Sequence, residues 1–171
     1  MKNKSFTLIE TLVAIAILSA AIAGPLVLSI KNIGSASVSQ DQLAAFYLGQ
    51  EVIEYVRNVR DTNLINGSGD WLTRLEKCTP SGSVSNSVGC YIDVKNDTVT
   101  DCGTSACSKL KFDGQNYNYT TGNDTVFTRI VKIDNTVGIG GDEAKIDIAV
   151  SWTGKYGTKT MNLQDNIFNW R

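Results

Sequence analysis

The stretch that decides the fold is Lys4–Ile30, with the sequence KSFTLIETLVAIAILSAAIAGPLVLSI. From Phe6 to Ile30 the only charged residue is Glu10. An α-helix over these 25 residues extends about 37 Å, which is long enough to cross a bilayer with some tilt. We therefore expect residues 6–30 to form a membrane-spanning helix.

Glu10 is unusual inside such a span, because a carboxylate near the bilayer centre costs about 2.5–3.5 kcal/mol. A plain membrane anchor gives no reason to keep it. A helix that later packs against other helices does, because a buried unpaired charge favours the arrangement that supplies its partner. The alternative is that Glu10 lies among the headgroups at the cytoplasmic end of the span.

Two lysines, Lys2 and Lys4, precede the apolar run, and no acidic residue offsets them. This charge distribution predicts a cytoplasmic N-terminus, with the rest of the chain crossing outward through the inner (cytoplasmic) membrane. A secretory signal peptide is the alternative. Its apolar core would be shorter, about 7–15 residues, and would be followed by a small-residue cleavage site.

Residues Lys4–Leu18 resemble the class III signal of type IV pilins and pseudopilins. In that family a membrane aspartyl peptidase removes a short basic leader just before an FTLIE-type sequence, and the new N-terminal Phe is N-methylated. The resemblance implies a leader over residues 1–5, prepilin peptidase cleavage between Ser5 and Phe6, and methylation of Phe6. It also implies that Glu10 is the charge used in assembly. Ser5 departs from the glycine that usually precedes the cut.

The resemblance further implies a structural subunit of a type IV pilus or a type II secretion-like filament. Its expected partners are other pilin-like subunits through the N-terminal helix, the prepilin peptidase/methylase, an inner-membrane assembly platform and membrane lipid. The stretch LGQEVIEYVRNVRDTN at Leu48–Asn63 favours a minor pilin or pseudopilin over a major one. The alternative function is a single-pass, membrane-tethered binding or adhesion module.

Small residues recur along the apolar run, with Ala16, Ala20 and Gly24 spaced four apart. This spacing lets helix backbones approach closely in a membrane or a filament core. Pro25 follows Gly24 and cannot donate a hydrogen bond to residue 21, which predicts a helix break or kink at Gly24–Pro25. Helices of the resembled family often unwind near such a proline when they pack in a filament.

Residues 31–63 predict an amphipathic continuation of the helix. The apolar residues of this half recur at steps of three or four and make one stripe: Ala45, Leu48, Val52, Tyr55, Val56 and Val59. The helix should end near Asn63, before the loop at Asn66–Gly69. The stripe needs an apolar surface to cover it.

Residues 64–171 predict a small antiparallel β domain. Lys145–Trp152 alternates strictly, Gly154–Gly157 is a turn, and Thr158–Gln164 returns as a hairpin strand. Phe127–Ile133 is a further strand, in which Arg129 is the exception on an otherwise apolar face. Shorter strands are expected within 89–94, 110–112 and 117–119. The fold class is α+β: one long N-terminal helix whose second half packs on a small antiparallel sheet.

Four cysteines, Cys78, Cys90, Cys102 and Cys107, fall in the part expected to be exported. They allow three pairings, of which Cys78–Cys90 and Cys102–Cys107 close the shortest loops. Disulfides suit an export compartment. A zinc site is the alternative, although the spacing contains no CxxC pair. We expect the bridges to staple a stretch that is poor in apolar residues.

The composition disfavours other classes of function. Histidine is absent, which excludes Ser–His and Cys–His nucleophile pairs and imidazole metal ligands. The net charge of −1 gives no basic surface for nucleic acid. We therefore expect neither an enzyme nor a resident cofactor or metal.

Overall fold

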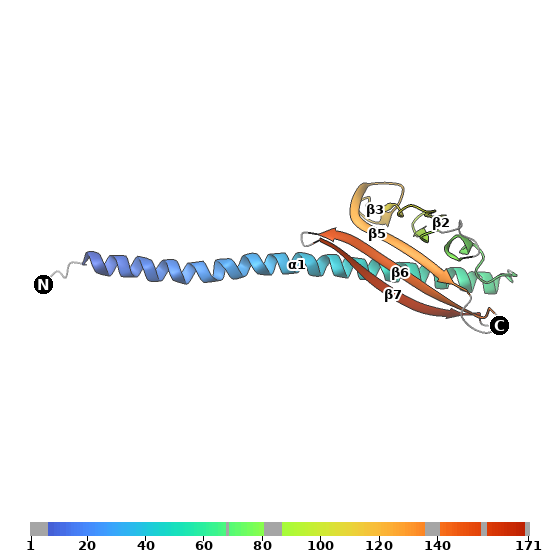
Figure 1. Cartoon of the computed structure of the whole chain (residues 1–171), viewed down its shortest axis with the longest axis horizontal. Coiled ribbons are helices and arrows are strands. Elements are labelled where there is room, and N and C mark those ends of the chain that lie inside the picture. Colours follow the sequence, from blue (N-terminus) through green and yellow to red (C-terminus); the bar gives the residue numbers. More distant parts are fainter. Residues whose placement is uncertain (1–6, 68, 81–86, 136–140, 155–156, 170–171) are drawn as a thin grey trace. The chain divides into compact units, whose positions relative to one another are not determined.

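The computed structural model describes residues 7–67, 69–80, 87–135, 141–154 and 157–169 (Figure 1). One helix, α1 (Leu8–Ile65), is followed by a short 3₁₀ helix, η1 (Glu76–Cys78), and then by strands. The chain divides into two compact units, residues 1–40 and 41–171. Residues 41–65 of α1 therefore belong to the same unit as the strands, and the expected α+β fold is confirmed.

The described strands form one antiparallel sheet of seven. They are β1 (Cys90–Asp93), β2 (Thr98–Asp101), β3 (Lys109–Phe112), β4 (Tyr117–Asn118), β5 (Asn123–Asp134), β6 (Glu143–Gly154) and β7 (Gly157–Phe168). The long strand β5 pairs with β6 along one side, and with β3 and β1 along the other. β6 continues into β7 through twelve consecutive residue pairs. The hairpin expected at the C-terminal end is confirmed, and it extends to Phe168.

The predicted apolar stripe of α1 covers the sheet. Five of its six residues are buried, namely Ala45, Leu48, Val52, Val56 and Val59, while Tyr55 is partly buried. They meet the core-facing residues of β6, which alternate with half-buried ones along the strand. Gly49 allows the closest approach, because a Cβ there would lie 2.7 Å from Leu163 Cδ1. Figure 1 shows β5, β6 and β7 beside this half of the helix.

The short strands are confirmed at β1, β3 and β4, but β2 lies in a stretch that we did not predict to be a strand. Its sequence, TVTD, offers a single apolar residue, and Val99 is only partly buried. β2 is ordered by pairing with β1, from Cys90 with Asp101 to Asp93 with Thr98. Four residues with one apolar side chain give no period to detect, so the tertiary pairing decides this strand.

The exception on β5 is explained by a buried guanidinium. Arg129 is 1% exposed and faces the core between the apolar residues Phe127 and Val131. Its Nη1 donates to Leu48 O and to Glu51 Oε2, both at 2.7 Å. Burial of a charge is tolerated only when its donors are satisfied in this way.

The same side chain also reaches the neighbouring strand β1. Nη2 of Arg129 donates to Ile92 O of β1 at 2.6 Å, and the guanidinium lies 6.0 Å from the centre of the Tyr119 ring. One arginine thus joins α1, β1 and β5. It fixes the register of the helix on the sheet, because its two donor groups meet main-chain carbonyls that cannot move independently.

Replacing Arg129 by Met should lower the free energy of unfolding by about 3 kcal/mol, because two buried carbonyls lose their donor. Glu51→Gln is the matched control. Its side chain is 36% exposed, so this change should cost about 1 kcal/mol or less. Urea unfolding of the full chain in detergent, with disulfides intact, measures both. Equal losses for the two variants would contradict the role of the main-chain contacts.

Candidate functional site: the N-terminal helix and the stapled loops

The N-terminal helix begins with a side-chain cap. Thr7 O accepts from Glu10 N at 3.0 Å and from Thr11 N at 3.3 Å, and Thr7 Oγ1 lies 3.4 Å from Glu10 N. Thr7 is therefore the N-cap residue and Glu10 the third residue of the helix, a spacing typical of a capping box. The expected cleavage site, Ser5–Phe6, lies just before this cap and outside the described residues.

Glu10 has no oppositely charged partner among the described residues. Its side chain is exposed, and in the part of the chain that the structure describes it makes no ion pair. Its position in the first turn is favourable, because the helix dipole places partial positive charge there. The carboxylate is thus held in the first turn of the helix, with no ion pair to another described residue.

The helix surface that follows Glu10 is apolar and uncovered. Leu8–Leu26 has a mean hydropathy of 2.0, with none of the segment buried. By length and composition it is the one helix among the described residues that is apolar enough to cross a membrane. Its hydroxyl groups are satisfied internally: Thr11 donates to Leu8 O and Ser19 to Ile15 O, both at 2.8 Å. Within Leu8–Leu26, no polar side chain after Glu10 therefore opposes contact with lipid.

Of the two outcomes predicted at Gly24–Pro25, a break does not occur in the single chain, since α1 is continuous through both residues. A kink at this position stays a prediction. Pro25 removes only one backbone donor, and the helix on either side keeps its own hydrogen bonds. Ser29 Oγ also donates to Pro25 O at 2.9 Å, which supports the next turn. Unwinding at this position within a packed filament stays a prediction.

All four cysteines are paired in the described structure, as Cys78–Cys90 and Cys102–Cys107. Cα–Cα is 4.9 Å in both bridges. This is the pairing that closes the shortest loops, and it replaces the zinc alternative. No cluster of potential metal ligands is found among the described residues.

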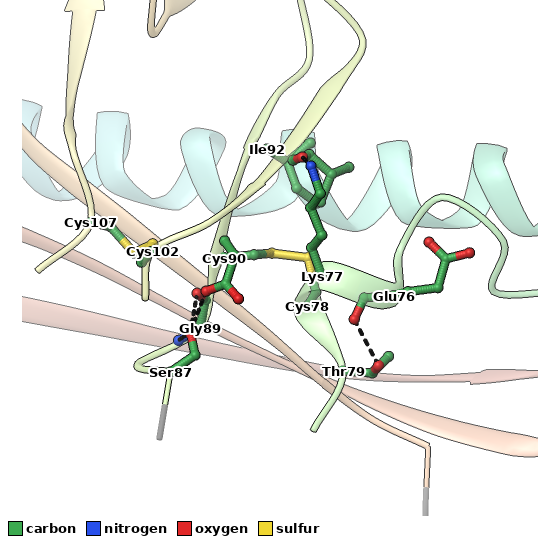
Figure 2. Close-up of a disulfide and its surroundings, with 12 residues drawn as sticks. Glu76, Lys77, Cys78, Thr79, Ser87, Gly89, Cys90, Ile92, Cys102 and Cys107 are labelled. Atoms are coloured by element: carbon green, nitrogen blue, oxygen red, sulfur yellow. Dashed lines mark hydrogen bonds between the residues drawn. A yellow bond between two sulfur atoms is a disulfide. The ribbon is translucent and has the colours of Figure 1, made fainter. Parts of the chain in front are cut away.

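The first bridge joins η1 to the sheet. Cys78 and Cys90 are 2% and 0% exposed, so the bridge is part of the core. Figure 2 shows it with the neighbouring polar contacts: Thr79 Oγ1 donates to Glu76 O at 2.8 Å, and Ser87 Oγ to Gly89 O at 3.0 Å. The bridge thereby attaches a connection with few apolar side chains to the buried strand β1.

A second anchor for the loops comes from α1. Tyr55 Oη donates to Asp97 Oδ1 at 2.8 Å, and Arg74 forms an ion pair with the same carboxylate. The Arg74 guanidinium lowers the pKa of Asp97 below its ordinary value. Burial, together with the bond to Asp97, raises the pKa of Tyr55 to about 12. This trio ties the segment after α1 and the turn between β1 and β2 to the helix.

Sequence reasoning missed two side chains that organise these loops. Asn63, which we expected only to end the helix, is 6% exposed and donates to Trp71 O and Thr73 O at 3.0 and 2.9 Å. Asp93 is 1% exposed and accepts from the backbone N–H groups of Asn96 and Tyr119. Both are polar residues next to turns, a signal that indicates capping but not its partner.

Comparison with known proteins finds one family at the N-terminus. Residues 1–24 match the family model described as the prokaryotic N-terminal methylation motif. The match covers the residues before the helix, the Thr7 cap and most of the apolar segment. No curated protein and no solved structure matches the chain.

The two disulfides should differ in their contribution to stability. Replacing Cys78 and Cys90 by Ala opens a bridge with a sequence separation of 12 and should cost about 3 kcal/mol. The matched pair, Cys102 and Cys107, has a separation of 5 and should cost about 2 kcal/mol. Thermal unfolding of the two double variants measures the difference. A larger loss from the Cys102–Cys107 pair would contradict the ranking.

Proposed function

We propose, from the type IV pilin-like prepilin signal that residues 1–24 carry, that this chain is a minor pilin or pseudopilin of a type IV pilus or type II secretion-like filament. The signal implies processing by a prepilin peptidase and assembly with other pilin subunits. The family of this motif is structural. The observation that carries the proposal is an uncovered apolar helix whose first turn holds an acid without an ion pair among the described residues, inside the segment that matches this signal.

The first proposed step is removal of residues 1–5 at the cytoplasmic face. Hydrolysis of the Ser5–Phe6 bond releases the leader and leaves an α-amino group on Phe6. Its ordinary pKa of about 7.7–8.0 keeps it largely cationic at neutral pH. Methylation adds a methyl group to this nitrogen without removing its capacity to carry charge. A new cation thus arises just before the Thr7 cap.

The second step uses Glu10. A cation at a helix N-terminus is disfavoured by the helix dipole, so the Phe6 amine gains from any nearby carboxylate. In a stack of helices the Glu10 of an incoming subunit meets the terminal amine of its neighbour. In an apolar environment the pair is attractive and each unpaired charge is costly. Glu10 therefore sets the axial register of one subunit on the next.

The proposed location follows from the same segment. The prepilin signal and the apolar helix suggest membrane anchoring, with 6–30 in the inner membrane and the N-terminus cytoplasmic. An assembly platform there extracts the subunit into the filament. Residues 31–63 and 64–171 then lie outside the membrane, where oxidising conditions suit the two disulfides. The minor-subunit assignment rests on Leu48–Asn63 and on the closing hairpin.

The mature N-terminus is the direct test of processing. Mass spectrometry of the chain expressed with its prepilin peptidase should show methylated Phe6 as the first residue. Ser5→Gly should be cut at least as fast, because it restores the residue usual in the family. Ser5→Trp should block the cut, and Asn3→Ala, a leader change away from the bond, should not. A functional, assembled chain that still begins at Met1 would overturn the processing step.

Glu10 is tested separately by charge and shape. Glu10→Gln keeps the shape without the charge and should reduce incorporation into filaments about tenfold or more, while the protein still accumulates in the membrane. Glu10→Asp keeps the charge and should retain part of the incorporation. Immunoblots of sheared filament and membrane fractions measure both. Unchanged incorporation of Glu10→Gln would instead favour a membrane-tethered binding module.

A further inference from the structure

The outer edge of the sheet is one long strand. β7 pairs with β6 from Gly157 to Phe168 without a shift of register, and its other side is unpaired in the part of the chain that the structure describes. An exposed edge offers backbone donors and acceptors to another strand, and proteins usually blunt it with prolines, bulges or several charges. β7 has no proline and no bulge, and its only charged residues are Lys159 and Asp165.

The core is also incomplete along this edge. The core-facing residues of β6 are nearly fully buried: Ile146 and Val150 are each 0% exposed. Met161 and Leu163 of β7 face the same layer, yet they are only partly buried where they pack against the core. The unpaired side of β7 therefore carries an apolar rim beneath its free backbone groups.

The sequence of β7 is complementary to itself when reversed. Residues that lie at equal distances before and after Asn162, from one to four positions away, have side chains of compatible chemistry. Directly opposite one another in an antiparallel pair of two copies would stand Met161 with Leu163, Thr160 with Gln164, Lys159 with Asp165, and Thr158 with Asn166. Apolar meets apolar, polar meets polar, and opposite charges meet on the same face. Such cross-strand pairs are what stabilise a sheet.

The two charged residues of β7, Lys159 and Asp165, differ in whether they already have an ion-pair partner. Asp165 already forms an ion pair with Arg57 at 2.9 Å, and its side chain is 23% exposed. Lys159 makes no ion pair within the described residues. A single lysine on an edge strand ordinarily guards it against pairing. Against a reversed copy the same lysine would instead reach the Arg57–Asp165 pair of that copy.

We propose that β7 is a self-association edge, at which two copies of this chain pair antiparallel about a two-fold axis through Asn162. The two sheets then continue as one across the contact. The rims of Met161 and Leu163 cover each other, and both Lys159 side chains gain a carboxylate. The contact is isologous, so it closes after two copies.

The direction of β7 relative to α1 determines how the helices of the two paired copies are oriented. Leu163 packs against Gly49 and Asp165 bonds Arg57, so β7 and this half of α1 run in the same sense (Figure 1). A two-fold axis across β7 therefore reverses the helix of the second copy. In a filament with all helices parallel, this contact joins two oppositely directed filaments laterally. That consequence rests on the proposed function, whereas the pairing of two copies does not.

Single cysteines on β7 test the register. The described native cysteines are all in disulfides, so an introduced thiol is the one available for cross-linking. Asn162→Cys should give a covalent dimer on mild oxidation of the full chain in detergent, because residue 162 faces its own copy at about 4.5–5.5 Å between Cα atoms. Thr160→Cys is the matched control on the same exposed face. Its two copies lie about 13 Å apart along the strand, and it should cross-link about tenfold less.

A mixture sharpens the same test. Chains with Thr160→Cys should cross-link to chains with Gln164→Cys, although neither should cross-link alone. Added to chains with Asn162→Cys, Lys159→Glu should abolish the covalent dimer. Mixing these chains with chains that carry both Asn162→Cys and Asp165→Lys should restore the dimer. Lys132→Glu on β5, added to Asn162→Cys, should leave the dimer intact. Two outcomes would overturn the proposal. One is that β7 forms no dimer and pairs with a different protein instead, and the other is equal cross-linking at positions 160 and 162. Because these assays use the uncut chain, their outcome is independent of leader processing.

Discussion

The apolar surface of residues 8–26 is not buried by any other described part of the chain, and that constraint shapes the interpretation of the molecule. α1 has 58 residues, about 87 Å of helix, whereas a strand of twelve residues such as β7 spans about 40 Å. A sheet of that size covers only one half of the helix. The chain divides between residues 40 and 41, and residues 41–65 of α1 belong to the same unit as the strands. The uncovered half needs lipid or other helices, and the prepilin signal in residues 1–24 supplies the biological context for both.

Sequence predicted well those elements whose periodicity arises from burial on one face. The stripe from Ala45 to Val59 and the alternation of β6 are confirmed. In both elements one face packs on the core, so the residue type at each position depends on which face it lies on. The prepilin signal was found through a motif, which needs no tertiary information, and the family match over residues 1–24 confirms it. The pairing of four cysteines was only favoured by loop length, since connectivity depends on where the strands bring the chain.

The parts that sequence did not predict depend on contacts between distant segments. In the sequence, Arg129 interrupts an apolar face without a visible reason. The structure supplies the reason, because Leu48 O, Glu51 and Ile92 O accept hydrogen bonds from it. β2 exists because β1 offers a partner, and α1 continues through Pro25 because one missing donor does not outweigh the neighbouring turns. In each case the local propensity is weak and the tertiary environment decides.

Arg129 and Glu10 express one physical principle in two settings. Each is a charge in an apolar environment, where a partner is worth more and its loss costs more than in water. For Arg129 the chain supplies partners for both terminal nitrogens, Nη1 and Nη2, so the charge fixes the helix on its own sheet. For Glu10 the described chain supplies none, so in the proposed filament the charge selects a neighbour. The two contacts proposed for this subunit then differ in symmetry. Pairing of Glu10 with the amine of the next subunit is heterologous and repeats without closing, which builds length. Pairing of β7 with itself is isologous and closes at two, so it cannot lengthen a filament and can only join one to another.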